Sequence, residues 1–67
     1  MELSARNQLS ATVKEVKLGT IMSEVTVDVG GQEIVAAITR QSTERLGLSP
    51  GDQVTVIIKA TEVMLGK

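Results

Sequence analysis

Apolar and polar residues alternate along most of this chain with the period of two that is typical of β-strands. Leu9, Ala11 and Val13 are each followed by a polar residue, which predicts a half-buried strand over residues 9–14. A second alternating run covers residues 21–29, and Gly30-Gly31 behind it can supply the positive φ of a tight hairpin turn. Residues 34–38, IVAAI, are apolar on both faces, which is typical of a strand covered on both sides.

The alternation stops at residues 39–52, TRQSTERLGLSPGD. A short helix is predicted there, capped by Thr39 or by Gln41-Ser42 and ended by Gly47, before a turn over residues 49–52. Residues 54–60 then predict a fourth strand and residues 62–66, EVMLG, a short fifth one. Five strands with a helix between the third and the fourth predict an all-β fold, a small Greek-key barrel of the oligonucleotide/oligosaccharide-binding (OB) type.

The composition limits how such a chain can be stabilised. A domain of 67 residues buries only about 60% of the surface that its unfolded chain exposes, so its core is marginal. The chain has no cysteine and no histidine, which excludes disulfides and the usual zinc sites. We therefore expect a homo-oligomer. With no signal peptide and no apolar run of about 20 residues, we expect a soluble, cytoplasmic protein without a membrane partner.

The same composition argues against enzymatic activity and against binding of nucleic acids. Without His or Cys there is no conventional pair of nucleophile and base, so we expect no enzyme. Glu24 and Asp28 share one strand face and are interpreted as solvated rather than as cation ligands. The chain has no aromatic residue for base stacking, and a net charge of −1 gives it no basic footprint for phosphates.

Hydrogen-bond donors are the remaining candidates for chemistry. Arg6 lies in the polar opening SARNQL, Thr39 and Ser42 lie where a strand passes into the helix, and Lys59 ends the apolar run VII. Hydroxyls at a helix start lie beside free N–H groups, which favours an anion. Two simpler interpretations stay open: Thr39 and Ser42 can serve only as caps, and Lys59 can simply carry its charge into solvent.

The combination of SARN, IT followed by QS, and IKAT, in this order, resembles the molbindins, the stand-alone Mop-type molybdate-binding proteins. The resemblance covers essentially residues 1–67 and implies a single Mop domain with an OB-like barrel, assembled as a trimer of dimers. It also implies that molybdate or tungstate, and no organic cofactor, binds at subunit interfaces. The implied ligand groups are Ser4, Arg6, Thr39, Ser42, Lys59 and backbone N–H groups near Ala60.

Two other functions compete with oxyanion storage. LGLSPGDQVTV resembles the Gly-Asp turn of swapped-hairpin, DNA-binding regulators and antitoxins, but those domains need a basic face that the acidic pI of about 5.2 argues against. A regulatory partner module that binds the anion only as a signal is the other alternative. Because the chain carries no fused effector domain, we expect storage or buffering rather than sensing.

Overall fold

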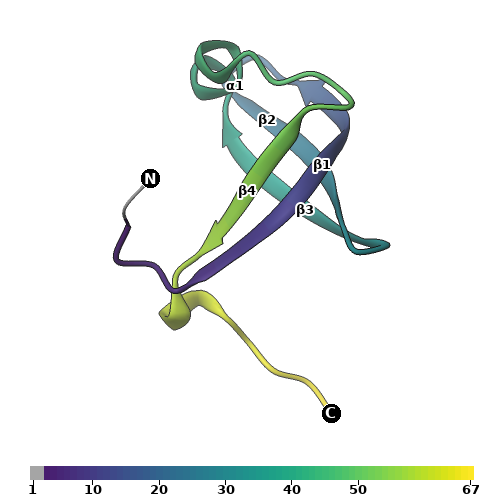
Figure 1. Cartoon of the computed structure of the whole chain (residues 1–67). Coiled ribbons are helices and arrows are strands. Elements are labelled where there is room, and N and C mark those ends of the chain that lie inside the picture. Colours follow the sequence, from purple (N-terminus) through teal and green to yellow (C-terminus); the bar gives the residue numbers. More distant parts are fainter. Residues whose placement is uncertain (1–2) are drawn as a thin grey trace.

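The computed structural model describes residues 3–67 and forms one curved antiparallel sheet. The strands follow the order β3-β2-β1-β4 across the sheet, and a short helix α1 connects β3 to β4 (Figure 1). A 3-10 helix, η1, follows the last strand. The bounds are β1 Asn7–Leu18, β2 Met22–Val29, β3 Gln32–Thr39, α1 Arg40–Leu46, β4 Gln53–Ile58 and η1 Ala60–Glu62.

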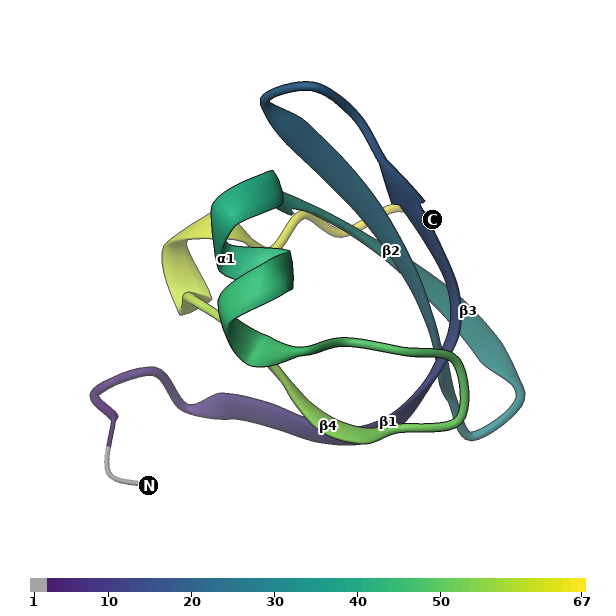
Figure 2. The same ribbon diagram turned by 90° about the horizontal axis from the view of Figure 1, so that it is seen from above.

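The alternating pattern places the core as predicted. Ala11 and Val13 from β1 and Val25 and Val27 from β2 are buried and form the centre of the apolar cluster, with partly buried residues of β3 and β4 packed around it. Val13 lies opposite Val27, and a β-bulge follows it in β1. Bulges increase local twist, and here the sheet curls until it encloses the core as an OB-like barrel (Figure 2).

The structure confirms the glycine turn predicted at residues 30–31 and the helix end predicted at Gly47. Gly30 and Gly31, with φ of 58° and 91°, connect β2 to β3 in the left-handed region that glycine adopts without strain. Gly47 ends α1 with φ of 63°, and its N–H bonds back to the carbonyl oxygen of Glu44.

The prediction that residues 34–38 are covered on both sides is wrong for the single chain. Side chains alternate along β3, so Ile34 and Ile38 pack against the core while Val35 and Ala37 are exposed on the outer face. The periodicity was right for a strand, but the apolar outer face has no covering element within residues 3–67.

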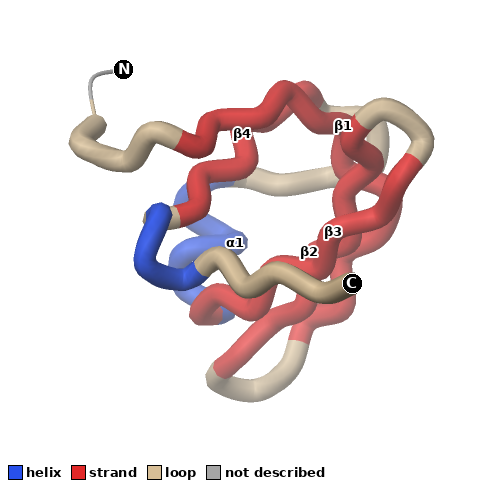
Figure 3. Tube along the Cα trace, turned by 90° about the horizontal axis from the view of Figure 1, so that it is seen from below, coloured by secondary structure: helices blue, strands red, loops and turns tan. Residues whose placement is uncertain are grey.

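The predicted fifth strand over residues 62–66 is also wrong. η1 takes up Glu62, and the tail behind it is irregular and leaves the sheet (Figures 1 and 3). Val63, Met64 and Leu65 are 47%, 92% and 95% exposed. A strand forms only where another strand accepts and donates its backbone hydrogen bonds, and within residues 3–67 this tail pairs with no strand.

Candidate functional site

The pairing of β1 with β4 brings the start of the first strand next to the end of the last strand. Asn7, the first residue of β1, lies opposite Ile58, the last residue of β4, and its side-chain Nδ2 donates to the carbonyl oxygen of Ile58 over 3.1 Å. The residues just before β1 therefore lie next to the residues just after β4. They line a hollow of about 250 Å³, which we call the terminal hollow: Ser4, Ala5, Arg6, Lys59, Ala60 and Thr61.

The lining of the terminal hollow contains cations and hydroxyls but no carboxylate. Within residues 3–67, neither Arg6 nor Lys59 forms an ion pair or a side-chain hydrogen bond. Three other cations do have carboxylate partners: Lys14 pairs with Glu33, Lys17 with Glu15 and Arg40 with Glu44. The hydrogen bond to Glu33 raises the pKa of the Lys14 ammonium above its usual value. The two positive charges of the terminal hollow thus remain available to an anion.

The backbone adds donors on the same side. The first residues of η1, Ala60 and Thr61, have N–H groups without an intrahelical acceptor, as at the start of any such helix. Thr61 also brings a hydroxyl that sequence reasoning missed. Its position directly after Lys59-Ala60 was the available signal. All four polar side chains that line the hollow can donate a hydrogen bond: Ser4, Arg6, Lys59 and Thr61.

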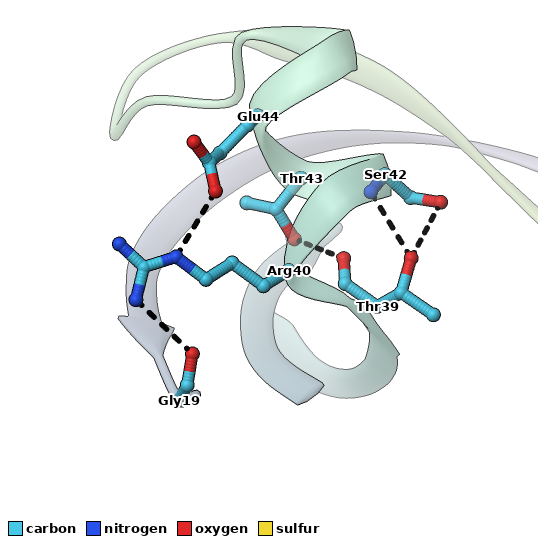
Figure 4. Close-up of polar contacts among 6 residues, drawn as sticks. All are labelled: Gly19, Thr39, Arg40, Ser42, Thr43 and Glu44. Carbon is cyan, nitrogen blue, oxygen red and sulfur yellow. Dashed lines mark hydrogen bonds and ion pairs between the residues drawn. The ribbon is translucent and has the colours of Figure 1, made fainter. Parts of the chain in front are cut away.

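Thr39 and Ser42 lie elsewhere, at the start of α1 (Figure 4). Thr39 is the N-cap: its Oγ1 accepts from the Ser42 N–H over 3.0 Å and donates to Ser42 Oγ over 2.8 Å. Arg45 Nη2 also donates to Ser42 Oγ, over 3.4 Å. The Ser42 hydroxyl accepts in both of these bonds, so its own proton is left to donate. The capping role of Thr39 is confirmed.

One chain does not bring all six predicted site residues together. α1 and η1 lie at opposite ends of the barrel (Figure 1), so Thr39 and Ser42 are far from the terminal hollow. Thr39 instead borders a hollow of about 460 Å³ that also contains Arg40 and Glu44. There Arg40 Nε donates to Glu44 Oε1 over 3.0 Å and its Nη1 donates to the Gly19 carbonyl oxygen over 3.3 Å, so its charge is already compensated.

Other kinds of site find little support in this part of the chain. Within residues 3–67, no group of three or more acidic, His or Cys side chains could hold a metal ion. Glu24 is exposed and Asp28 is half-buried, as expected for residues on the outer face of β2. Among the described residues, no helix is long and apolar enough to cross a membrane.

Comparison with known proteins shows similarity over nearly the whole chain. The TOBE domain family matches residues 3–65. Molybdenum-pterin-binding protein 1 of Clostridium pasteurianum is 42% identical over 66 residues, which cover 97% of each chain. A molybdate-binding protein from Sporomusa ovata has the same fold, with a TM-score of 0.96, 51% identity and 100% of each chain covered. The cytoplasmic molybdate-binding protein ModG, with molybdate bound, matches with a TM-score of 0.85 and 43% identity over 90% of this chain and 43% of its own.

Proposed function

The chain belongs to the TOBE-domain family, as a binding protein rather than an enzyme, and from this premise we propose that it binds molybdate, and equally tungstate, in the terminal hollow. Arg6 and Lys59 supply charge, Ser4 supplies a hydroxyl, and the backbone N–H groups at Ala60 supply further donors. The observation that carries the proposal is a lining with several donors and no carboxylate, in which two cations have no carboxylate partner within residues 3–67.

The chemistry of the anion fits this lining. Molybdate at neutral pH is a fully deprotonated tetrahedral dianion, so all its oxygens accept hydrogen bonds. Monoprotonated phosphate brings a proton for which the hollow holds no side-chain acceptor other than hydroxyls, and an unmatched polar group costs about 1–3 kcal/mol. Sulfate carries no such proton, so it must be discriminated by its smaller size. Tungstate matches molybdate in both respects.

The location of Thr39 and Ser42 supports a site that needs a second subunit. Because α1 lies at the other end of the barrel, these hydroxyls reach a terminal hollow only if they belong to a neighbouring chain. One Arg6 and one Lys59 only just neutralise a dianion, so sites where several copies of Lys59 meet on a symmetry axis are favoured. We propose a homo-oligomer, a trimer of dimers, with molybdate at its interfaces.

The biological role we propose is intracellular storage or buffering of molybdenum in the cytoplasm. ModG, a similar protein, is a cytoplasmic molybdate-binding protein. The family assignment leaves the swapped-hairpin, DNA-binding alternative without a supporting observation. The segment that suggested it, LGLSPGDQVTV, forms the end of α1, a turn and β4 of the barrel.

Calorimetric titration with molybdate, tungstate, sulfate and phosphate, combined with native mass spectrometry, tests the proposal. We expect molybdate and tungstate to compete closely, sulfate to bind weakly and phosphate hardly at all. The mass should be that of an oligomer, with ions bound in a fixed ratio to subunits. Phosphate binding as tight as molybdate binding would contradict a site selective for a fully deprotonated anion, and a monomer that binds molybdate would contradict the interface.

A further inference from the structure

The polar opening SARNQL contains two side-chain amides, Asn7 and Gln8, that are not among the groups of the proposed anion site. They begin β1 directly behind residues 4–6, which lie outside the strand ladder. Asn7 is half-buried and Gln8 is exposed. Each of the two amides donates a hydrogen bond to a backbone carbonyl oxygen at or next to the terminal hollow.

The Asn7 amide connects the two chain segments that line the terminal hollow. Its Nδ2 donates to the carbonyl oxygen of Ile58 over 3.1 Å, in a partly buried bond between residues 51 positions apart. Asn7 directly follows Arg6, and Ile58 directly precedes Lys59. The bond therefore joins the immediate neighbours of the two cations that line the hollow.

The Gln8 amide holds the segment in front of the strand. Its Nε2 donates to the carbonyl oxygen of Ala5 over 3.0 Å, so the bond closes a short stretch of chain around Arg6. Fixing a backbone segment that lies outside a ladder costs conformational entropy. A hydrogen bond that fixes it before the ligand arrives removes part of this cost from binding. Both amides thus act on the backbone that carries Arg6.

We propose that Asn7 and Gln8 are positioning residues of the anion site: they hold residues 4–6 against the end of β4, so that Arg6 and Lys59 line one hollow before the anion binds. Neither amide side chain lines the terminal hollow itself, so each acts through the backbone that it bonds. The inference rests on the proposed function and deepens it, because it assigns the arrangement of the ligand groups to two residues outside the hollow.

Gln53 provides a matched control in the same pair of strands. Its Nε2 donates to Thr12 Oγ1 over 2.9 Å, and these two residues face each other at the other end of the β1–β4 ladder. Neither of them lines the terminal hollow. Gln53 and Gln8 are both exposed glutamines, so the same substitution removes one amide hydrogen bond beside the hollow or one far from it.

Calorimetric titration of three variants with molybdate tests the positioning role. Asn7→Leu keeps the shape of the side chain without its donor, and Gln8→Met and Gln53→Met do the same for the longer amide. One neutral hydrogen bond corresponds to about a two- to tenfold change in an equilibrium constant. We expect Asn7→Leu and Gln8→Met to raise the Kd by about this factor and Gln53→Met to leave it unchanged. An equal rise in Gln53→Met would overturn the proposal. Because Gln8 is exposed, Gln8→Met keeps the test decisive even if Asn7→Leu disturbs folding.

Two further measurements separate positioning from a general loss of stability. Added to Arg6→Ala, Gln8→Met should raise the Kd by less than it does in the wild-type protein, because the side chain that it positions is gone. Fully additive effects would overturn the proposal. Without ligand, ¹⁵N relaxation should give the Arg6 backbone N–H an order parameter near the rigid value of about 0.85, which falls in Asn7→Leu and Gln8→Met but not in Gln53→Met.

The positioning role and the proposed function fail in different ways. If the wild-type protein binds molybdate and both Asn7→Leu and Gln8→Met bind it with the wild-type Kd, only the positioning role is overturned. If calorimetry detects no molybdate binding to the wild-type protein, the proposed function is overturned, and the positioning of an anion site is overturned with it.

Discussion

Replacing Lys59 or Arg6 by alanine removes one of the two positive charges that line the terminal hollow. A hydrogen bond to a charged group contributes about 1.5–3 kcal/mol, and each 1.4 kcal/mol is about tenfold in affinity. We therefore expect each substitution to weaken molybdate binding about ten- to a hundredfold. Both side chains are exposed and make no ion pair within residues 3–67, so the free energy of unfolding should change by less than about 0.5 kcal/mol.

Two measurements separate binding from folding in these variants. Calorimetric titration gives the Kd for molybdate, and thermal unfolding with and without molybdate gives the stabilisation by the ligand, which falls as the Kd rises. The Tm without ligand should hold or increase, because clustered positive charges repel each other when no anion is present. Lys17→Ala serves as a control, since Lys17 is exposed and lies outside the terminal hollow. Wild-type molybdate affinity in the Arg6→Ala, Lys59→Ala double variant, with its oligomeric mass retained, would refute the assignment of the site.

Three further predictions concern stability and are read from urea unfolding. Thr39→Ala removes the N-cap of α1 and should lower the free energy of unfolding by about 1 kcal/mol; no change would mean that the cap bond contributes nothing in solution. Ser23 is 2% exposed and its Oγ has no hydrogen-bond partner within residues 3–67, so Ser23→Ala should leave stability unchanged or raise it by about 1 kcal/mol; a clear loss would reveal a partner of this hydroxyl in the assembled protein. Gly47→Ala places a Cβ on a residue with φ of 63° and should cost about 1–2 kcal/mol; an unchanged midpoint would mean that α1 can end in another conformation.

The sequence predicted those parts of the fold that depend on contacts within one chain. Alternation at residues 9–14 and 21–29 marked β1 and β2, whose inward residues such as Val13 and Val25 form the core. The Gly30-Gly31 turn and the Thr39 cap could be predicted because each depends on neighbouring residues only. The turn needs residues with positive φ, and the helix start needs an acceptor for its free N–H groups. The apolar tail at residues 62–66 was wrongly predicted to be a strand of the barrel. A run of apolar residues indicates that a segment is buried, but it does not specify the strand with which the segment pairs.

The site was harder to predict because its groups are distant in sequence. Arg6 and Lys59 come together only through the register that places Asn7 opposite Ile58, and no periodicity in the sequence specifies that register. The resemblance to molbindins supplied both residues, and the structure places them in one hollow. Thr61 was missed although it directly follows Lys59-Ala60, and this adjacency was the signal that could have found it.

The distribution of donors has a thermodynamic consequence if two chains complete one site. A ligand that binds only the assembled form must stabilise that form, and assembly must raise ligand affinity by the same factor. Without an anion, the terminal hollow carries the positive charges of both Arg6 and Lys59, which would oppose association if copies of it met. In such a site, molybdate would remove that repulsion and would accept hydrogen bonds from both chains. Anion binding and subunit association are then linked equilibria, and such an assembly is more stable with its ligand than without it.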